Sequence, residues 1–182
     1  MTKPRMNRMK SPTKRRKTTT PSGETQVFSL DVSILNGPMS ERFVRNNPKV
    51  SRTIAICGDH TLAHLHGAIF NAFGRDDEHL YEFQIGGKEP MDRKARRYGL
   101  SMVIDDLFDE PKSHGSVERT TLDSLGLATG DVFRYWFDFG DDWWHQITVL
   151  TITAKAPRGK LPKVTQRVGQ SPPQYVDWDE EE

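Results

Sequence analysis

The sequence predicts an α+β fold, with a β-grasp-like mixed sheet of about five strands and one long helix packed on a face of the sheet. Several short stretches between residues 27 and 153 alternate apolar and polar residues, which is typical of strands with one buried face. One longer stretch, residues 59–74, repeats its apolar residues at spacings of three and four, which is typical of a helix. Two strands precede the helix and the others follow it, which is the order of a β-grasp sheet.

The first two strands lie in the N-terminal third of the chain. Residues 27–34 alternate strictly between Val, Ser and Asp on one side and Phe, Leu, Val and Ile on the other, which indicates a half-buried strand. The Asn-Gly-Pro that follows breaks this strand. Residues 51–57 are mostly apolar and form a second short strand.

The helix follows directly. Either Asp59 or Thr61 can cap its N-terminus, and Gly74 ends it. His60 and His64 are spaced four apart, which allows a shared metal ion, but without the Glu of an H-E-x-x-H motif the spacing favours two solvated histidines. The core face is formed by four apolar side chains, those of Leu62, Leu65, Ile69 and Phe73.

The second half of the chain supplies three further strands. Residues 79–85 form one, with His79 and Ile85 on the same face. The polar residues 86–120 predict a long irregular connection, functional or disordered, with a solvated basic run at Arg93–Arg97. A short helical turn at residues 121–127 precedes strands within 131–139 and 144–153.

Charge divides the chain into three parts. Residues 1–23 carry eight basic side chains and no acid and are predicted to be a disordered tail. Residues 24–156 form the single predicted domain, and residues 157–182 a loosely ordered tail ending in an acidic cluster. The basic tail favours contact with nucleic acid or an acidic protein partner, or serves only for solubility; the candidate contacts are Lys14, Arg15, Arg16 and Lys17.

The composition excludes several classes of protein. A single cysteine, Cys57, cannot form an intramolecular disulfide and does not suit a zinc site built from cysteines; at the end of an apolar strand it is expected in the core. No apolar run approaches the roughly 18 residues of a membrane span, and no apolar stretch follows the basic N-terminus as in a secretory signal. We therefore expect a cytoplasmic protein without membrane contact.

The stretch FDFGDDWWHQI, residues 137–147, allows two interpretations. In the first, Asp138–Asp142 is a hairpin connection, since Gly permits a positive φ and Asp bonds nearby backbone N–H groups. The half-buried His145 would then find its partner in Asp138 or Asp141. In the second, this stretch is part of a site for a divalent metal such as Zn²⁺ or Fe²⁺. The candidate ligands are His66, His79, Asp138, Asp141 and His145.

A family resemblance rests on two stretches. TLAHLHGAIFNAFGRDDEHLYEF contains Leu65-His66, Phe73-Gly74 and His79–Phe83, and YWFDFGDDWWHQITV contains Asp138–His145. In these motifs the chain resembles the plasmid pRiA4b ORF-three-like family, sometimes labelled as insertion-sequence passenger proteins of a "TnpR" type, over roughly residues 26–153. It departs from the family pattern at Arg75, where a Trp is usual, and at the C-terminus, which lacks a Cys-containing, Gly-rich segment.

The resemblance implies a compact α+β domain and no established activity. The label implies a genomic association with mobile elements, since nothing in the chain is similar to the serine and arginine set of a resolvase. We therefore predict a non-catalytic binding or accessory module that contacts nucleic acid through its basic tail. The alternative is a metal-dependent hydrolase, in which the five candidate ligands would hold the metal and activate water.

Overall fold

The structure, a computed structural model, describes residues 25–101, 114–154 and 158–175 of the 182-residue chain. Its elements are β1 (Val27–Asn36), α1 (Glu41–Asn46), β2 (Ser51–Cys57), α2 (Leu62–Phe73), β3 (Tyr81–Ile85), β4 (Arg96–Gly99), β5 (Gly115–Ser116), the 3₁₀ helix η1 (Asp123–Leu125), β6 (Val132–Phe137), β7 (Trp143–Thr153) and β8 (Lys163–Val168). No helix in these three ranges is long and apolar enough to cross a membrane.

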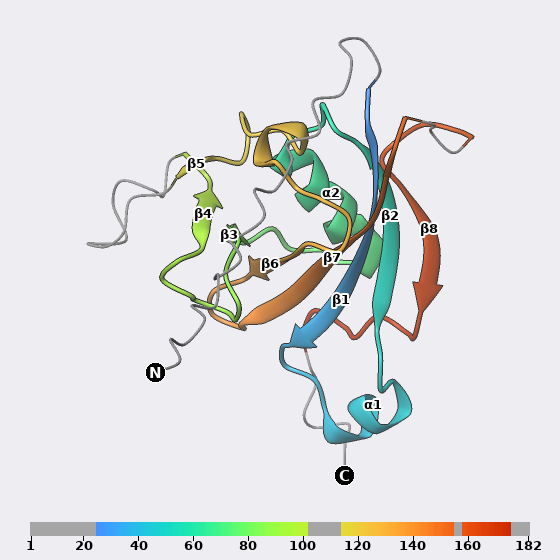
Figure 1. Ribbon diagram of the computed structural model, residues 1–182. Coiled ribbons are helices and arrows are strands. Elements are labelled where there is room, and N and C mark those ends of the chain that lie inside the picture. The colour runs from blue at the N-terminus through green and yellow to red at the C-terminus, as the bar shows by residue number, and fades with distance from the viewer. Residues whose placement is uncertain (1–24, 102–113, 155–157, 176–182) are drawn as a thin grey trace, which may run out of the picture.

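The strands form one mixed sheet in the order β5-β4-β3-β6-β7-β1-β2-β8. The β4–β5 pair is parallel, and the other described pairs are antiparallel. β1, β2 and β8 lie side by side along one part of the sheet, and β6 runs across their direction (Figure 1). The α+β class is therefore confirmed, but the prediction of about five strands in a β-grasp-like arrangement is wrong.

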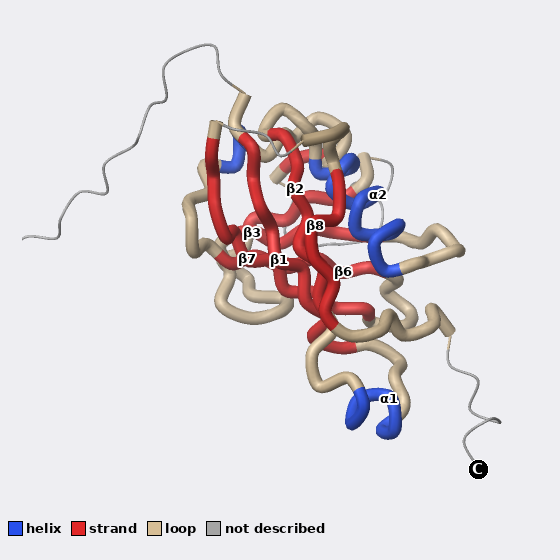
Figure 2. Tube along the Cα trace, turned by 90° about the vertical axis from the view of Figure 1, so that its right-hand side faces the viewer, coloured by secondary structure: helices blue, strands red, loops and turns tan. Residues whose placement is uncertain are grey.

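The core lies between the sheet and α2, which Figure 2 shows on one side of the strands. Strands alternate as predicted, so that Phe133, Tyr135 and Phe137 of β6 are buried on the same face. The four predicted core residues of α2 are all buried, together with Ala72. The helix therefore packs on a sheet face because its apolar stripe matches the buried side of the alternating strands.

The two ends of α2 have the expected signals. Thr61 is the N-cap: its hydroxyl accepts from the His64 N–H, and the His64 ring accepts from the Thr61 N–H. Gly74 ends the helix in the left-handed conformation, at φ 64°. His60 lies before the cap, so His60 and His64 do not share a helix face, although their rings stack at 5.0 Å.

Replacing Gly74 with alanine is expected to lower the free energy of unfolding by about 1 kcal/mol, because a Cβ in the left-handed region is strained even where space is open. The matched control is Gly67→Ala in the middle of α2, where the added methyl group also meets nothing within 4 Å. It is expected to stabilise by about 0.5–1 kcal/mol, because it lies in an ordinary helical conformation. Urea unfolding of both variants measures the difference, and equal effects would contradict it.

The C-terminal part differs from the prediction of a loosely ordered tail. Between residues 158 and 175 the chain forms β8, which pairs with β2 at the edge of the sheet. The buried Arg52 fixes this strand, because its guanidinium donates to the carbonyl oxygens of Ala72, Val168 and Gly169. Polar composition concealed the strand, since its hydrogen bonds come from β2 and not from an apolar pattern of its own.

The connection predicted to be irregular, residues 86–120, also contributes two short strands, β4 and β5. Within the basic run predicted to be solvated, Arg97 donates to both carboxylate oxygens of Glu82 at 2.8 and 2.9 Å, and Arg96 donates to the carbonyl of Leu125. The side chain of Arg97 is therefore tied to the sheet through Glu82 of β3, and that of Arg96 to the end of η1. The remainder of the connection, residues 102–113, lies outside the described residues.

Candidate functional site

A surface pocket of about 620 Å³ lies where α2 faces the start of β3. It brings together two of the predicted site histidines, one from the helix and one from the segment before the strand. The complete lining is Ala63, His66, Glu78, His79, Leu80, Tyr81 and Leu100. Titratable side chains therefore border accessible space in this pocket.

His66 is held in one orientation on the inner side of this pocket. Its ring stacks on Tyr81 with centroids 3.6 Å apart, its Nδ1 lies 2.7 Å from the Tyr135 hydroxyl, and its Nε2 lies 3.2 Å from the Glu78 carboxylate. Burial lowers the pKa of His66, against the opposing effect of Glu78, and burial raises the pKa of Tyr135 well above its usual value. The arrangement fits a neutral imidazole that accepts from Tyr135 and donates to Glu78.

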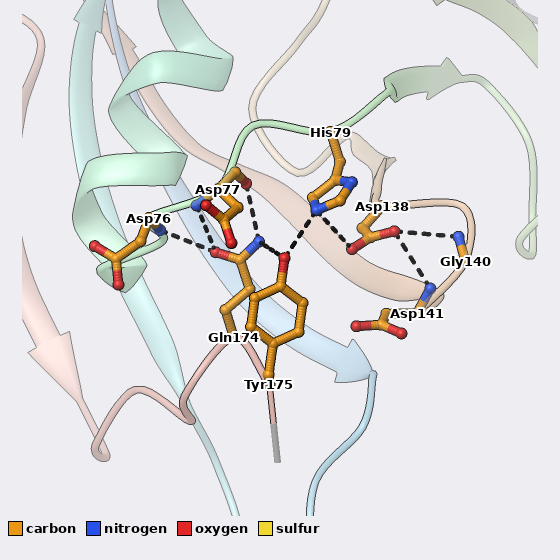
Figure 3. Close-up of polar contacts among 8 residues, drawn as sticks. All are labelled: Asp76, Asp77, His79, Asp138, Gly140, Asp141, Gln174 and Tyr175. Atoms are coloured by element: carbon orange, nitrogen blue, oxygen red, sulfur yellow. Dashed lines mark hydrogen bonds and ion pairs between the residues drawn. The ribbon is translucent and has the colours of Figure 1, made fainter. Parts of the chain in front are cut away.

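His79 forms a second imidazole–carboxylate pair at the outer side. Its Nε2 lies 3.4 Å from Oδ2 of Asp138 and 3.0 Å from the Tyr175 hydroxyl (Figure 3). The side chain of His79 is 37% exposed, whereas that of Asp138 is 9% exposed. His79 and Asp138 lie close together because Tyr81 of β3 pairs with Phe137 of β6 in an antiparallel register. His79 lies just before β3 and Asp138 just after β6, so both are at the same end of this strand pair.

Asp138 also builds the turn between β6 and β7. It adopts a left-handed conformation at φ 53°, and its Oδ1 accepts from the N–H groups of Gly140 and Asp141 (Figure 3). Its carbonyl accepts from the N–H of Asp142 at 2.8 Å. Asp138–Asp142 is thus a hydrogen-bonded hairpin connection, with Asp138 bonded to His79 and not to His145.

Two residues that follow β8 in the chain, Gln174 and Tyr175, contact the segment before β3. The buried Gln174 accepts from the N–H groups of Asp76 and Asp77 and donates to the carbonyl of Asp77 (Figure 3). It thereby positions Tyr175 beside His79. Sequence reasoning missed both residues, because a Gln-Tyr pair inside a polar, Pro-rich stretch gives no periodic signal; the aromatic ring was the one available hint.

His145 lies in the core, away from the pocket. It is 1% exposed and packs against the rings of Phe73 and Tyr135, each 5.2 Å away. Burial, reinforced by Arg75, lowers its pKa to about 3; the backbone groups of Trp143 and Tyr135 oppose this, but neither ring nitrogen makes a hydrogen bond of normal geometry within the described residues. His145 is therefore a neutral core residue at physiological pH.

Arg75 is a buried cation that sequence reasoning noted only as a departure from the family pattern. Its guanidinium lies 3.8 Å from the centre of the Trp143 ring and donates to the carbonyl of Pro172. Burial lowers its pKa to about 10, while Tyr135 and Asp138 act in the opposite direction. Arg75 therefore stays charged and contributes to the low pKa of His145.

The five predicted metal ligands do not gather at one point. His79 and Asp138 meet, His66 forms its own pair, Asp141 contributes a turn N–H, and His145 is in the core. Across residues 25–101, 114–154 and 158–175, the group of three such residues with ligand atoms within 4.8 Å of one another is a different one, Cys57, Asp59 and His60. The candidate nucleic-acid contacts Lys14, Arg15, Arg16 and Lys17 lie outside the described residues.

Comparison with known proteins places this fold and these motifs in one family. The family model described as plasmid pRiA4b ORF-3-like protein matches residues 42–178, which include the pocket, the hairpin and Gln174. The chain belongs to the plasmid pRiA4b ORF-3-like family. The predicted family membership is thereby confirmed, and the match extends beyond the predicted C-terminal limit of the resemblance.

Two known proteins are similar to this pRiA4b ORF-3-like protein, one in sequence and one in fold. "Uncharacterized protein y4hQ" of Sinorhizobium fredii is 30% identical over 131 residues, which are 71% of this chain and 60% of y4hQ. The crystal structure of the protein of unknown function MM3350 from Methanosarcina mazei Go1 superimposes with a TM-score of 0.63 at 21% identity. The superposition covers 84% of this chain and 75% of MM3350, and it shows a shared fold.

Proposed function

We propose that this pRiA4b ORF-3-like protein is a non-catalytic binding module that contacts nucleic acid through residues 1–23. The observation that supports a non-catalytic role is that the candidate catalytic side chains are either hydrogen-bonded within the fold or buried in the core. Both nitrogens of His66 are engaged, Asp138 holds a turn, and His145 is neutral in the core. Among the described residues, the pocket lining contains no Ser, Thr, Cys or Lys that would serve as a nucleophile.

Charge supports nucleic acid as the partner and the N-terminal segment as the contact. Residues 1–23 hold eight basic side chains and no acid. The end of the sheet beside the pocket is acidic, since Asp76, Asp77 and Glu78 precede His79, and Asp138, Asp141 and Asp142 lie in the hairpin. Phosphates are repelled there and attracted to the tail. The same proposal includes an accessory role in mobile elements, which rests on the family label. It also includes a cytoplasmic location, because a chain with a single cysteine suits a reducing compartment.

The test is duplex DNA binding by fluorescence anisotropy across a range of salt concentrations. The variant carries four substitutions, Lys14→Gln, Arg15→Gln, Arg16→Gln and Lys17→Gln. The affinity of the unsubstituted chain for DNA is expected to fall as the salt concentration rises. In the variant, the slope of log K against log salt is expected to be flatter by up to about 4, because each lost phosphate contact removes about 0.9 from the slope.

The matched control removes the same charge from exposed positions of the folded part: Arg42→Gln, Arg45→Gln, Lys49→Gln and Arg119→Gln. It is expected to retain most of the salt slope. Absence of binding, salt-independent binding, or equal losses in the two variants would contradict contact through the tail. An acidic protein as the true partner would give the first of these outcomes.

A metal-dependent hydrolase is the second candidate, and one contact favours it. His79 and Asp138 lie 3.4 Å apart, and His79 is accessible from the pocket. This function predicts that His79→Ala loses bound metal while the fold survives, as measured by elemental analysis and circular dichroism, whereas His145→Leu in the core keeps it. Metal retained in His79→Ala would exclude His79 as a ligand.

A further inference from the structure

The turn between β2 and α2 gathers three different metal-ligating side chains. Cys57, Asp59 and His60 each offer one ligand atom, and these atoms all lie within 4.8 Å of one another. The turn is closed by a hydrogen bond from the His60 N–H to the Cys57 carbonyl at 3.1 Å. Three ligands within four residues therefore project from one tight turn, separate from the pocket and from the hairpin.

The backbone around this turn is fixed from two sides. The Gly58 N–H donates to the carbonyl of Gln26 at 2.7 Å, just before β1. From the η1 side, the N–H of Leu122 donates to the His60 carbonyl at 3.1 Å, and the N–H of Asp123 donates to the Gly58 carbonyl at 2.9 Å. The backbone that carries the ligating side chains is therefore set by the fold before any ion binds, which favours a specific site.

Asp123 brings a further carboxylate against the backbone of the same turn. A Cβ added to Gly58 would lie 2.0 Å from the Asp123 Oδ1, so this oxygen rests directly against the glycine between Cys57 and Asp59. Within the described residues, no Lys or Arg forms an ion pair with Asp59 or Asp123. Two carboxylates and a thiol thus share a small region in which a bound cation would relieve the repulsion between the carboxylates.

His60 supplies a nitrogen that points to the same conclusion. Its Nδ1 is shielded from water and has no hydrogen-bond partner among the residues that the structure describes. Such an atom costs about 1–3 kcal/mol when it is left unsatisfied. Coordination to a metal, directly or after a flip of the ring, would remove this cost.

We propose that Cys57, Asp59 and His60 bind a divalent transition-metal ion, best Zn²⁺, with Asp123 or a water molecule as the fourth ligand. Sulfur, nitrogen and carboxylate oxygen together suit a borderline-soft ion and do not suit Mg²⁺ or Ca²⁺. Two atoms bonded to one tetrahedral Zn²⁺ lie about 3.3–3.6 Å apart. The three ligand atoms lie within 4.8 Å of one another, so side-chain rotations that draw them together by about 1 Å would complete the site. The ion would tie the end of β2 to the start of α2 and, through Asp123, to η1.

The single cysteine makes the experiment selective. Co²⁺ is titrated into the reduced full-length chain, and the thiolate-to-cobalt charge-transfer band is recorded; any such band must come from Cys57. We expect saturation near one equivalent, displacement by Zn²⁺, and loss of the band in Cys57→Ser. Asp59→Asn and His60→Ala are expected to weaken Co²⁺ binding at least about tenfold.

His79→Ala is the control, because it removes a ligand of the set predicted from sequence and leaves the β2–α2 turn intact. Its band and affinity are expected to match those of the unsubstituted chain. If Cys57→Ser fails to fold, the Asp59→Asn and His60→Ala variants test the site instead. A second test in the unsubstituted chain is whether added Zn²⁺ protects the Cys57 thiol from alkylation. No band at stoichiometric Co²⁺, or a band of unchanged strength in both Asp59→Asn and His60→Ala, overturns the proposal.

Discussion

Replacing Trp143 with alanine is expected to lower the free energy of unfolding by about 3–5 kcal/mol, the largest effect of a single substitution that we predict. The side chain is fully buried, and its ring packs against the Arg75 guanidinium at 3.8 Å. A Cβ added to Gly37 would lie 2.2 Å from the ring, so the backbone there also touches the indole. Truncation to alanine would leave a cavity beside the buried Arg75 guanidinium. The protein would then lose both the packing of the ring and its cation–π contact with Arg75.

Urea unfolding followed by circular dichroism measures this loss without relying on tryptophan fluorescence. Trp143→Phe is expected to recover much of the stability, because it keeps an aromatic face for Arg75, and the indole N–H has no hydrogen-bond partner within the described part of the chain. Leu150→Ala on the same strand is the matched control: this side chain is 42% exposed, so a loss below about 1 kcal/mol is expected. Similar losses at Trp143 and Leu150 would contradict the assignment of the ring to the core.

Acidification is expected to destabilise the protein through His145 well before its carboxylates are protonated. The folded state holds the pKa of this imidazole at about 3, below its unfolded value near 6.5. The unfolded chain therefore binds the proton first, so the stabilisation is complete above about pH 6.5 and is lost progressively as the pH falls toward 3. Between about pH 7 and pH 4 the loss is about 3 kcal/mol, since one pH unit is worth about 1.4 kcal/mol.

His145→Leu isolates this contribution. It keeps an apolar group of similar size against Phe73 and Tyr135 but removes the titrating ring. The unfolding free energy of the variant is expected to vary less with pH than that of the unsubstituted chain, by about 3 kcal/mol over the same interval. Burial also lowers the pKa of His66, which adds dependence of the same sign to both proteins and cancels in the comparison. Parallel pH profiles would show that His145 is not held neutral.

The elements predicted correctly are those whose own residues carry the signal. The alternation of residues 27–34 and the apolar stripe of α2 are local patterns, and burial enforces both. The strands β4, β5 and β8 lack such patterns because they are short or polar, and their hydrogen bonds come from neighbouring strands. Long-range pairing of this kind cannot be inferred from the composition of the segment alone.

The same distinction applies to the site. The Asp138–Asp142 turn was predictable from its Asp and Gly residues, because those types favour turns by themselves. The partner of Asp138 was not, because sheet register brings His79 to it and keeps His145 inside. Sequence likewise suggested His60 as a helix partner of His64, whereas the N-cap at Thr61 leaves His60 in the turn with Cys57.

The position of β1 has a consequence for the order in which the protein can be assembled. This first strand lies inside the sheet, where Leu30 pairs with Val149 on one side and Ile54 on the other. During synthesis β1 can therefore pair with β2 soon after both emerge, but its other edge must wait for β7. Pairing over such a sequence separation is slow to form, so we expect folding on the millisecond-to-second scale, with one edge of β1 exposed until β7 has been synthesised.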